Sequence, residues 1–150
     1  MSIWTHPPDL AEVNRTVMAA GLAGHLSVKV TDFDSESLTC TMPITEATRQ
    51  PEGLLNGGAS AALAEITGGV AGSFCIDRST QTVVGQEISV SHLRSGRSGH
   101  LRATARPLRL GKRSQVWHIE MRDDDGELIA VSRLTNAVLE RRRSHPWSAP

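Results

Sequence analysis

One long and almost uncharged segment constrains this chain more than any other feature. Residues 56–72 read NGGASAALAEITGGVAG, and Glu65 is the only ionisable side chain among them. Asn56 is placed to cap the first turn of a helix there. A helix this apolar must bury its surface against another layer of structure, so we expect it to form the centre of the fold.

Glu65 lies on a helical face that carries almost no side chains. Its neighbours three and four positions away are Ala61, Ala62, Gly68 and Gly69. A carboxylate in apolar surroundings is costly unless it is paired, hydrated or used in chemistry. Small neighbours leave room for a ligand to approach. Glu65 is therefore either a catalytic carboxylate or a buried acid paired with an arginine such as Arg94.

Hydrophobic periodicity and turn residues predict the other elements. Apolar residues at helical spacing predict a helix from Asp9, its N-cap, to Gly21, its stop. Alternating apolar and β-branched residues predict strands at 25–32, 38–42, 81–93, 100–108, 113–122 and 128–139. Turns are expected at 34–36, 96–99, 110–112 and 123–126, and an irregular stretch at 43–55.

This order of elements predicts an α+β fold in which the long helix lies on a curved antiparallel sheet. We expect consecutive hairpins to form a meander. Gly68, Gly69 and Gly72 cost roughly 1 kcal/mol each relative to alanine inside a helix, so they should allow the sheet to wrap closely. An open sheet has edges, and pairing with a second subunit is one way to cover them.

Length and composition narrow the class of protein. The 150 residues suit a single domain, with a core at about 9–139 and a frayed tail from Glu140. A formal net charge of zero, no apolar run of membrane length and no signal-peptide pattern predict a cytoplasmic protein without nucleic-acid or membrane partners. Cys40 and Cys75 lack metal-site or redox spacing, so we expect no metal.

Short motifs occur in a fixed order along the chain. They are QPEGLLNGGAS at 50–60, LAE at 63–65, VVG at 83–85, HLRSG at 92–96, PLRLGKR at 107–113, QVW at 115–117 and SRLT at 132–135. The set resembles the hot-dog-fold acyl-CoA thioesterases, in the branch of 4-hydroxybenzoyl-CoA and 1,4-dihydroxy-2-naphthoyl-CoA thioesterases. The resemblance implies hydrolysis of an aryl- or fatty acyl-CoA without a cofactor, since coenzyme A is part of the substrate. It also implies homodimers, paired into tetramers, with active sites at the dimer interface.

The resemblance implies roles for matching positions. Glu65 matches the catalytic carboxylate, Gln50 a glutamine that places the thioester, and Gly57 the residue whose N–H polarises the carbonyl. The positions matching acyl-CoA contacts are Gly85, His92, Leu93, Arg94, Ser95, Arg109, Gly111, Lys112, Arg113 and Ser114. The basic residues among them form either a solvated charged face or a cradle for the nucleotide phosphates.

Two positions depart from the family pattern. Asn56 replaces a histidine before the Gly-Gly pair, and Gly69 replaces a serine or threonine one turn after Glu65. Asparagine still donates a hydrogen bond, but it cannot carry a proton near neutral pH. Asn56 is expected to act as a helix cap, as a group that orients the thioester with Gln50, or as both.

Thioester hydrolysis needs a nucleophile and a stabilised oxyanion. Glu65 could activate water as a general base or attack the carbonyl itself to form an anhydride. The standard helical rise puts it roughly 12 Å along the axis from Gly57, too far for both to act on one carbonyl. We therefore expect the helix of a second subunit to complete the site.

Two other classes of function are compatible with the sequence. A non-catalytic acyl-CoA binding or sensing protein would retain the binding residues after losing the histidine at position 56. A hydratase on the same fold ranks last, because that chemistry usually needs an Asp/His pair on the helix segment, and residues 56–72 contain none.

Overall fold

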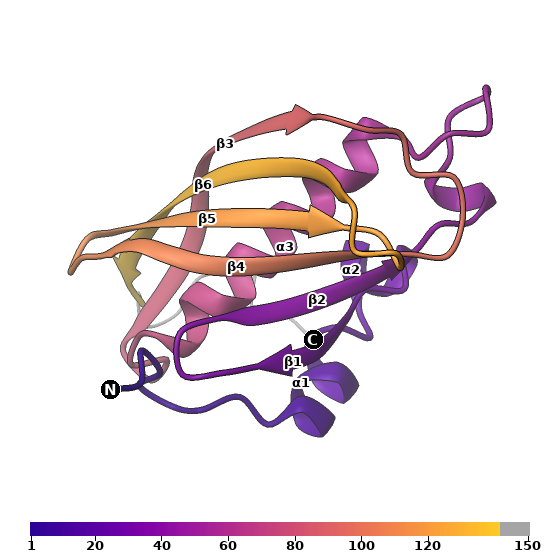
Figure 1. The fold of residues 1–150 in the computed structure, drawn as a ribbon. Helices are drawn as coiled ribbons and strands as arrows, with labels where there is room; N and C mark the ends of the chain where they lie inside the picture. Colours follow the sequence, from indigo (N-terminus) through magenta and orange to yellow (C-terminus); the bar gives the residue numbers. More distant parts are fainter. Residues whose placement is uncertain (142–150) are drawn as a thin grey trace.

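The computed structural model describes residues 1–141, which form one antiparallel sheet curved around one long helix (Figure 1). The helices are α1 (Leu10–Thr16), α2 (Gly21–His25) and α3 (Gly57–Phe74), with a short 3-10 helix at Glu46–Thr48. The strands are β1 (Lys29–Phe33), β2 (Leu38–Pro43), β3 (Gln81–His92), β4 (His100–Leu110), β5 (Ser114–Arg122) and β6 (Leu128–Glu140). This arrangement confirms the predicted hot-dog fold of the α+β class.

The strand order corrects the predicted meander. The sheet runs β1-β2-β4-β5-β6-β3, so β3 does not pair with β4, which follows it in sequence. Instead β3 forms a long antiparallel ladder with β6, from the pair Gln81–Glu140 to the pair His92–Ala130. After α3 the chain continues into β3, which forms the sheet edge farthest from β1. The sheet can therefore wrap the helix from both sides (Figure 1).

The N-terminal helix is shorter than predicted. Asp9 is its N-cap, as expected, and its carboxylate accepts a hydrogen bond from the Glu12 N–H at 3.0 Å. Gly21, the predicted stop, instead begins α2 with a positive φ of 58°. Since α2 extends to His25 and Ser27 adopts a φ of 55°, the first strand begins at Lys29 and not at His25.

The sheet approaches α3 most closely at two glycines. A Cβ atom at Gly68 would lie 2.5 Å from the Leu134 side chain, and one at Gly72 would collide with the amide of Gln115. Gln115 Nε2 donates to the Gly72 carbonyl and Asn136 Nδ2 donates to the Gly68 carbonyl, each at 3.1 Å. These two bonds fix α3 along the sheet.

Gly69 does not share this role. Apart from the backbone of α3 itself, no atom of residues 1–141 lies within 4 Å of the position that its Cβ would occupy. The prediction of close wrapping is therefore confirmed for Gly68 and Gly72 and is wrong for Gly69.

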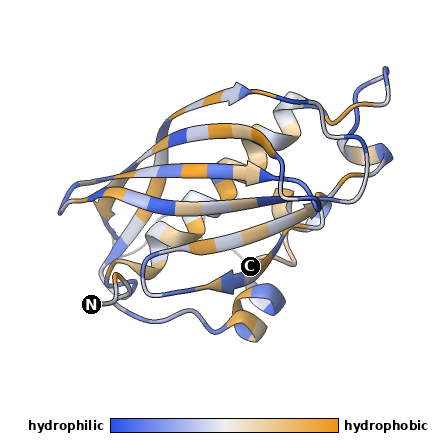
Figure 2. Ribbon diagram, in the orientation of Figure 1, coloured by the Kyte–Doolittle hydropathy of each residue, from blue (hydrophilic) through white to orange (hydrophobic). Residues whose placement is uncertain are grey.

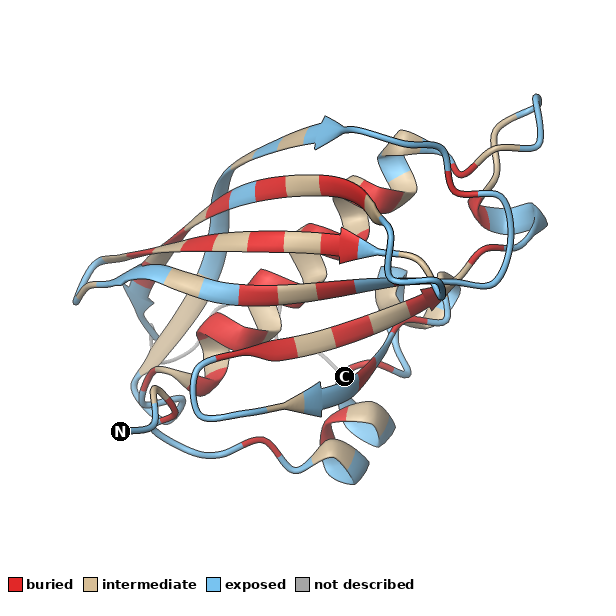
Figure 3. Ribbon diagram, in the orientation of Figure 1, coloured by how far each residue is buried: buried red, intermediate tan, exposed pale blue. Residues whose placement is uncertain are grey.

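The core lies between α3 and the concave face of the sheet. Most of α3 is apolar or made of small residues (Figure 2). Buried residues alternate along β2, β4 and β5 and recur along β6, whereas β3 has none (Figure 3). The edge strand β3 thus completes the sheet without contributing a buried residue to the core.

Two further observations apply to residues 1–141. No helix in this part of the chain has the length and hydropathy needed to cross a membrane. The predicted fraying from Glu140 onward falls mostly on residues 142–150, which lie outside the described residues, although Glu140 itself ends β6.

Candidate active site

The carboxylate of Glu65 lies against the edge strand. Glu65 is half-buried near the middle of α3, and its side chain reaches Gly85 on β3 so closely that a Cβ atom there would overlap Oε1. Gly85 is itself exposed and adjoins an irregularity in the β3–β6 ladder, between Gly85 and Glu87. Only glycine at position 85 admits the carboxylate, which ends close to solvent at the outer strand.

Glu65 is not part of an ion pair. Among residues 1–141 it has no hydrogen-bond or ion-pair partner, and burial raises the pKa of its carboxyl group. Arg94, the partner considered from the sequence, instead binds Glu127 at 2.9 Å on the surface. The interpretation of Glu65 as a buried acid paired with Arg94 is therefore wrong.

The first turn of α3 is organised by Asn56. Its Oδ1 accepts a hydrogen bond from the Gly58 N–H at 2.8 Å, which confirms the predicted N-cap. The Gly57 N–H donates to no acceptor among the described residues. It lies at the positive end of an 18-residue helix, where a developing negative charge is stabilised.

The His92 imidazole packs directly on this helix end. A Cβ atom at Gly57 would lie 2.9 Å from His92 Nε2 and 3.3 Å from Cε1, so glycine at this position makes room for the ring. His92 is the last residue of β3 and is exposed. The structure thus brings His92, Asn56 and Gly57 together at one end of α3.

Gln50 belongs to a tight turn just before α3. Its N–H donates to the Leu54 carbonyl at 2.8 Å, and its carbonyl accepts from the Gly53 N–H at 2.9 Å. Gln50 lines an open pocket of about 350 Å³ together with Glu46, Arg49, Pro51 and Gly53. Arg49 was not among the site residues predicted from the sequence, although it directly precedes Gln50, the first residue of the first motif.

These groups form two separate halves in one chain. Gln50, Gly57 and His92 lie at the N-terminal end of α3, whereas Glu65 and Gly85 lie near its middle. Glu65 follows Gly57 by eight residues, which corresponds to about 12 Å along a helix. The outer edge of β3 runs along both halves and pairs with no other strand within residues 1–141.

The remaining predicted contact residues occupy two different ends of the sheet. Leu93, Arg94 and Ser95 follow His92 and are exposed, and the first two donate backbone N–H groups to the Ile129 carbonyl. The other group surrounds the β4–β5 turn, at the opposite end of the sheet from the N-terminus of α3 (Figure 1). Its members are Arg109, Gly111, Lys112, Arg113 and Ser114. A single chain does not bring these two groups together.

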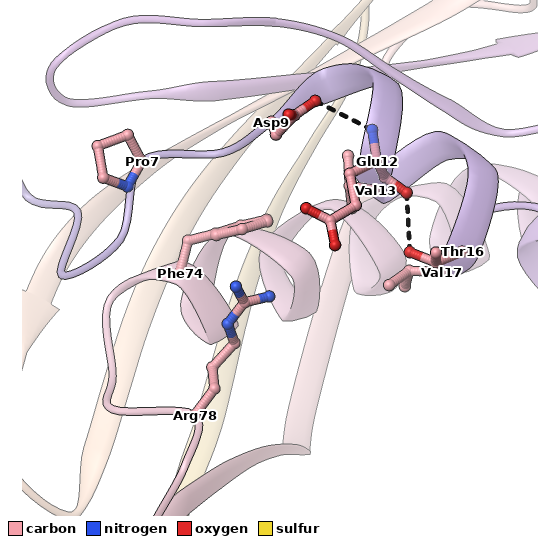
Figure 4. Close-up of a pocket in the computed structure, with 8 residues that line it drawn as sticks. All are labelled: Pro7, Asp9, Glu12, Val13, Thr16, Val17, Phe74 and Arg78. Carbon is pink, nitrogen blue, oxygen red and sulfur yellow. Dashed lines mark hydrogen bonds between the residues drawn. The ribbon is translucent and has the colours of Figure 1, made fainter.

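A small pocket lies at the C-terminal end of α3 (Figure 4). It has a volume of about 90 Å³ and lies between α1 and Phe74, with the Arg78 guanidinium 4.7 Å from the centre of the Phe74 ring. None of the predicted site residues lines it. The residues around this pocket join α1 to the C-terminal end of α3. Among residues 1–141, no three His, Cys, Asp or Glu side chains gather closely enough to bind a metal ion.

Comparisons with known proteins agree with this arrangement. The sequence profile of the thioesterase superfamily matches residues 52–130. The 1,4-dihydroxy-2-naphthoyl-CoA hydrolase of Escherichia coli is 44% identical over 138 residues, which cover 91% of this chain and 99% of that protein.

Solved structures of thioesterases share the fold. A mutant of a Pseudomonas aeruginosa thioesterase, in which a glutamine is replaced by alanine, superposes with a TM-score of 0.91 at 41% identity and covers 93% of this chain and 100% of its own. A Staphylococcus aureus protein has been solved as a glutamate-to-alanine mutant, with a TM-score of 0.78 at 30% identity over 81% of this chain and 100% of its own. It has also been solved as a glutamine-to-alanine mutant and is there named a thioesterase.

The environment of Glu65 predicts how its ionisation affects stability. Burial raises the pKa of Glu65, so the folded protein holds this proton more tightly than the unfolded chain. The resulting stabilisation is complete below the unfolded-state pKa and is lost as pH rises through the folded-state pKa. We expect Glu65→Gln to raise the urea midpoint of unfolding at pH 7, and the difference from the parent to vanish near pH 4.

Glu120→Gln is the matched control, measured at the same protein concentration. A hydrogen bond from Arg122 holds the pKa of Glu120 below its usual range, so this substitution should lower the midpoint at pH 7. A Glu65→Gln protein that is no more stable than the parent at pH 7 would contradict the described environment of Glu65.

Proposed function

We propose that this chain, which belongs to the thioesterase superfamily, hydrolyses an aryl- or fatty acyl-CoA thioester to a free acid and coenzyme A. The observation that carries this proposal is the half-buried Glu65 carboxylate, which has no partner among the described residues and ends at the exposed Gly85. A carboxylate kept unpaired in a partly desolvated position has the raised proton affinity that general-base catalysis uses.

The proposed chemistry needs neither a metal nor a cofactor. As a general base, Glu65 accepts a proton from water while the water oxygen attacks the thioester carbon. The carbon–sulfur bond then breaks, and the coenzyme A thiolate leaves and takes up a proton. As a nucleophile, Glu65 attacks the same carbon, the carbon–sulfur bond breaks and the coenzyme A thiolate leaves to take up a proton; water then hydrolyses the resulting anhydride to the free acid and regenerates the Glu65 carboxylate. Both routes develop negative charge on the carbonyl oxygen, and that charge needs a donor.

The N-terminus of α3 is suited to supply that donor. The Gly57 N–H has no acceptor among residues 1–141 and lies at the positive end of the helix. Asn56 caps the helix through Oδ1, which leaves its Nδ2 group able to orient the thioester together with Gln50. The exposed His92 ring packed on Gly57 could contact the substrate at the same end.

We propose that two subunits combine to form each site. One chain supplies Glu65 and Gly85, and its partner supplies Gln50, Gly57 and His92. Two features support this arrangement: the separation of the two halves along α3, and the long edge strand β3, which has no buried residue. Joining such edges would bring a second α3 alongside the first. Such an assembly could also place the β4–β5 turn of one subunit, with Arg109, Lys112 and Arg113, next to the substrate bound at another subunit.

The relatives support the choice of residues and of substrate class. In the Staphylococcus aureus protein, the mutated glutamine and glutamate lie fifteen positions apart, as do Gln50 and Glu65 in this chain. The Escherichia coli relative is named for an aryl-CoA substrate, 1,4-dihydroxy-2-naphthoyl-CoA. An aryl-CoA is therefore the first substrate to test.

Two observations favour a second candidate, an acyl-CoA binding or sensing protein without turnover. Asn56 stands where the family has histidine, and its side-chain oxygen is already used to cap α3. Gly69 likewise leaves open space where the family has a hydroxyl group.

The role of Glu65 is tested by turnover of benzoyl-CoA and medium-chain acyl-CoA, followed by release of free thiol. We expect Glu65→Gln to lower kcat by at least about a hundredfold, because removal of a general base has an effect of that size. Glu36→Gln, in the exposed turn between β1 and β2, is the control and should retain activity. An unchanged kcat in Glu65→Gln would remove this residue from the mechanism.

The two departures from the family pattern should be reversible. We expect the double substitution Asn56→His and Gly69→Ser to raise kcat at least about tenfold. The histidine adds a titratable ring at the N-terminus of α3, and the serine adds a hydroxyl group one helical turn after Glu65. The open space at Gly69 accommodates the new side chain, although loss of the Asn56 cap should cost about 1 kcal/mol of stability.

Gly69→Ala, which fills the same space without a hydroxyl group, is the control for this experiment. If Asn56→His combined with Gly69→Ser and Asn56→His combined with Gly69→Ala have equal kcat values, the hydroxyl group has no role. Thioester binding without thiol release in the parent would favour the binding or sensing protein.

A further inference from the structure

Arg49 lies in the pocket next to Gln50, and neither the sequence motifs nor the comparisons assign it a role. We infer that Arg49 binds an anionic group of the thioester substrate, either a phosphate of coenzyme A or a charged group on the acyl part. This inference rests on the proposed function, because it places the anion beside the glutamine that would orient the thioester.

Among the arginines of residues 1–141, Arg49 is the one that is half-buried, and it has no acidic partner. Arg94, Arg102, Arg106 and Arg122 each lie within 4.0 Å of a carboxylate oxygen. Arg49 is half-buried and, within residues 1–141, forms no ion pair, although Glu46 lines the same pocket. The chain therefore places an uncompensated positive charge in a recess.

The guanidinium of Arg49 also has an unsatisfied donor. Its Nη2 group donates to the Arg97 carbonyl at 2.9 Å, while Nε is buried and has no hydrogen-bond partner in the described part of the chain. A buried donor on a charged group is costly to leave unpaired. The remaining Nη donors of this charged guanidinium suit the oxygens of a phosphate or a carboxylate, with which they form strong charge-assisted hydrogen bonds.

The loop that carries Arg49 is held by backbone bonds on both sides. Arg49 pairs with Leu55 across a β-bridge, and the Leu55 N–H donates to the Gly96 carbonyl at 2.8 Å. The Asn56 N–H donates to the Thr48 carbonyl, also at 2.8 Å, which ties the residue before Arg49 to the cap of α3. Arg49 is thus fixed relative to the end of α3 that carries the proposed oxyanion donor.

The pocket is an open recess that is large enough for part of a ligand. Its volume of about 350 Å³ falls in the range of small-molecule sites, and Gln50 forms part of its lining. Glu46 is the only acidic residue that lines it. Because this carboxylate would repel a bound anion, its removal should strengthen binding, whereas removal of Arg49 should weaken it.

The test compares KM and kcat of the parent protein, Arg49→Met and Arg49→Lys. We expect Arg49→Met to raise KM about tenfold or more with little change in kcat. Arg49→Lys should raise KM less, because lysine retains the positive charge but lacks the forked N–H groups of the guanidinium. Glu46→Gln should lower KM. Arg102→Met, which removes an arginine paired with Asp124 on the outer face of the sheet, is the control and should leave KM unchanged.

Two substrate comparisons identify the anion. An acyl-pantetheine thioester lacks the nucleotide phosphates, and aryl substrates can be chosen with or without a carboxylate or hydroxyl group. An effect of Arg49→Met that disappears with acyl-pantetheine supports phosphate binding. An effect that disappears with the neutral aryl group supports binding of the acyl part. An equal rise in KM for every substrate, or no rise, overturns the inference and leaves Arg49 as a link between two loops.

The same variants separate this inference from the proposed function. If the parent hydrolyses none of these substrates, the proposed function fails, and the Arg49 inference is tested by calorimetric binding of thioether analogues of the same compounds. A weaker affinity of Arg49→Met for the charged analogues alone supports the anion site, whereas equal affinities for parent and variant contradict it.

Discussion

The close contact between α3 and the sheet determines the rest of this structure. At Gly68 and Gly72 the helix has no side chains, so the sheet can approach its backbone. The buried amides of Gln115 and Asn136 then donate hydrogen bonds to the helix carbonyls and fix its position along the strands. That position determines where Glu65 meets the edge strand at Gly85. A shift of α3 by one turn would move the carboxylate about 5 Å from this opening.

The unpaired state of Glu65 gives the structure its functional meaning. The other half-buried acids among residues 1–141 have local partners: Glu120 binds Arg122, and Asp123 accepts hydrogen bonds from the Asp125 and Glu127 N–H groups. Glu65 has no such partner among residues 1–141, and burial raises its pKa. The fold therefore holds an unpaired carboxylate at an open edge, while the N-terminal end of the same helix, with a Gly57 N–H that has no acceptor among the described residues, lies elsewhere along α3. This separation is what makes a second subunit necessary to the proposed mechanism.

Local signals in the sequence predicted much of this arrangement, because capping, periodicity and turn residues act over a few positions. The Asn56 cap, the extent of α3 and most strand bounds follow from them. The position of β3 could not be predicted in the same way, since pairing of Gln81–His92 with β6 depends on how the whole sheet closes. The contact between His92 and Gly57 joins residues 35 positions apart. Arg49 was missed because an arginine in a loop is usually solvated. Only the structure reveals that its Nε is buried without a hydrogen-bond partner among the described residues.

Subunit complementation tests the central claim most directly. Glu65→Gln and Gln50→Ala each damage one half of every proposed site, so each homodimer should be inactive. A mixed dimer, purified with two different affinity tags after coexpression, combines the intact Glu65 of one chain with the intact Gln50 of the other at one of its two sites. If each site is shared between two chains, this mixed dimer regains about half of the parent's turnover. A mixed dimer no more active than either variant alone would contradict a site shared between two chains.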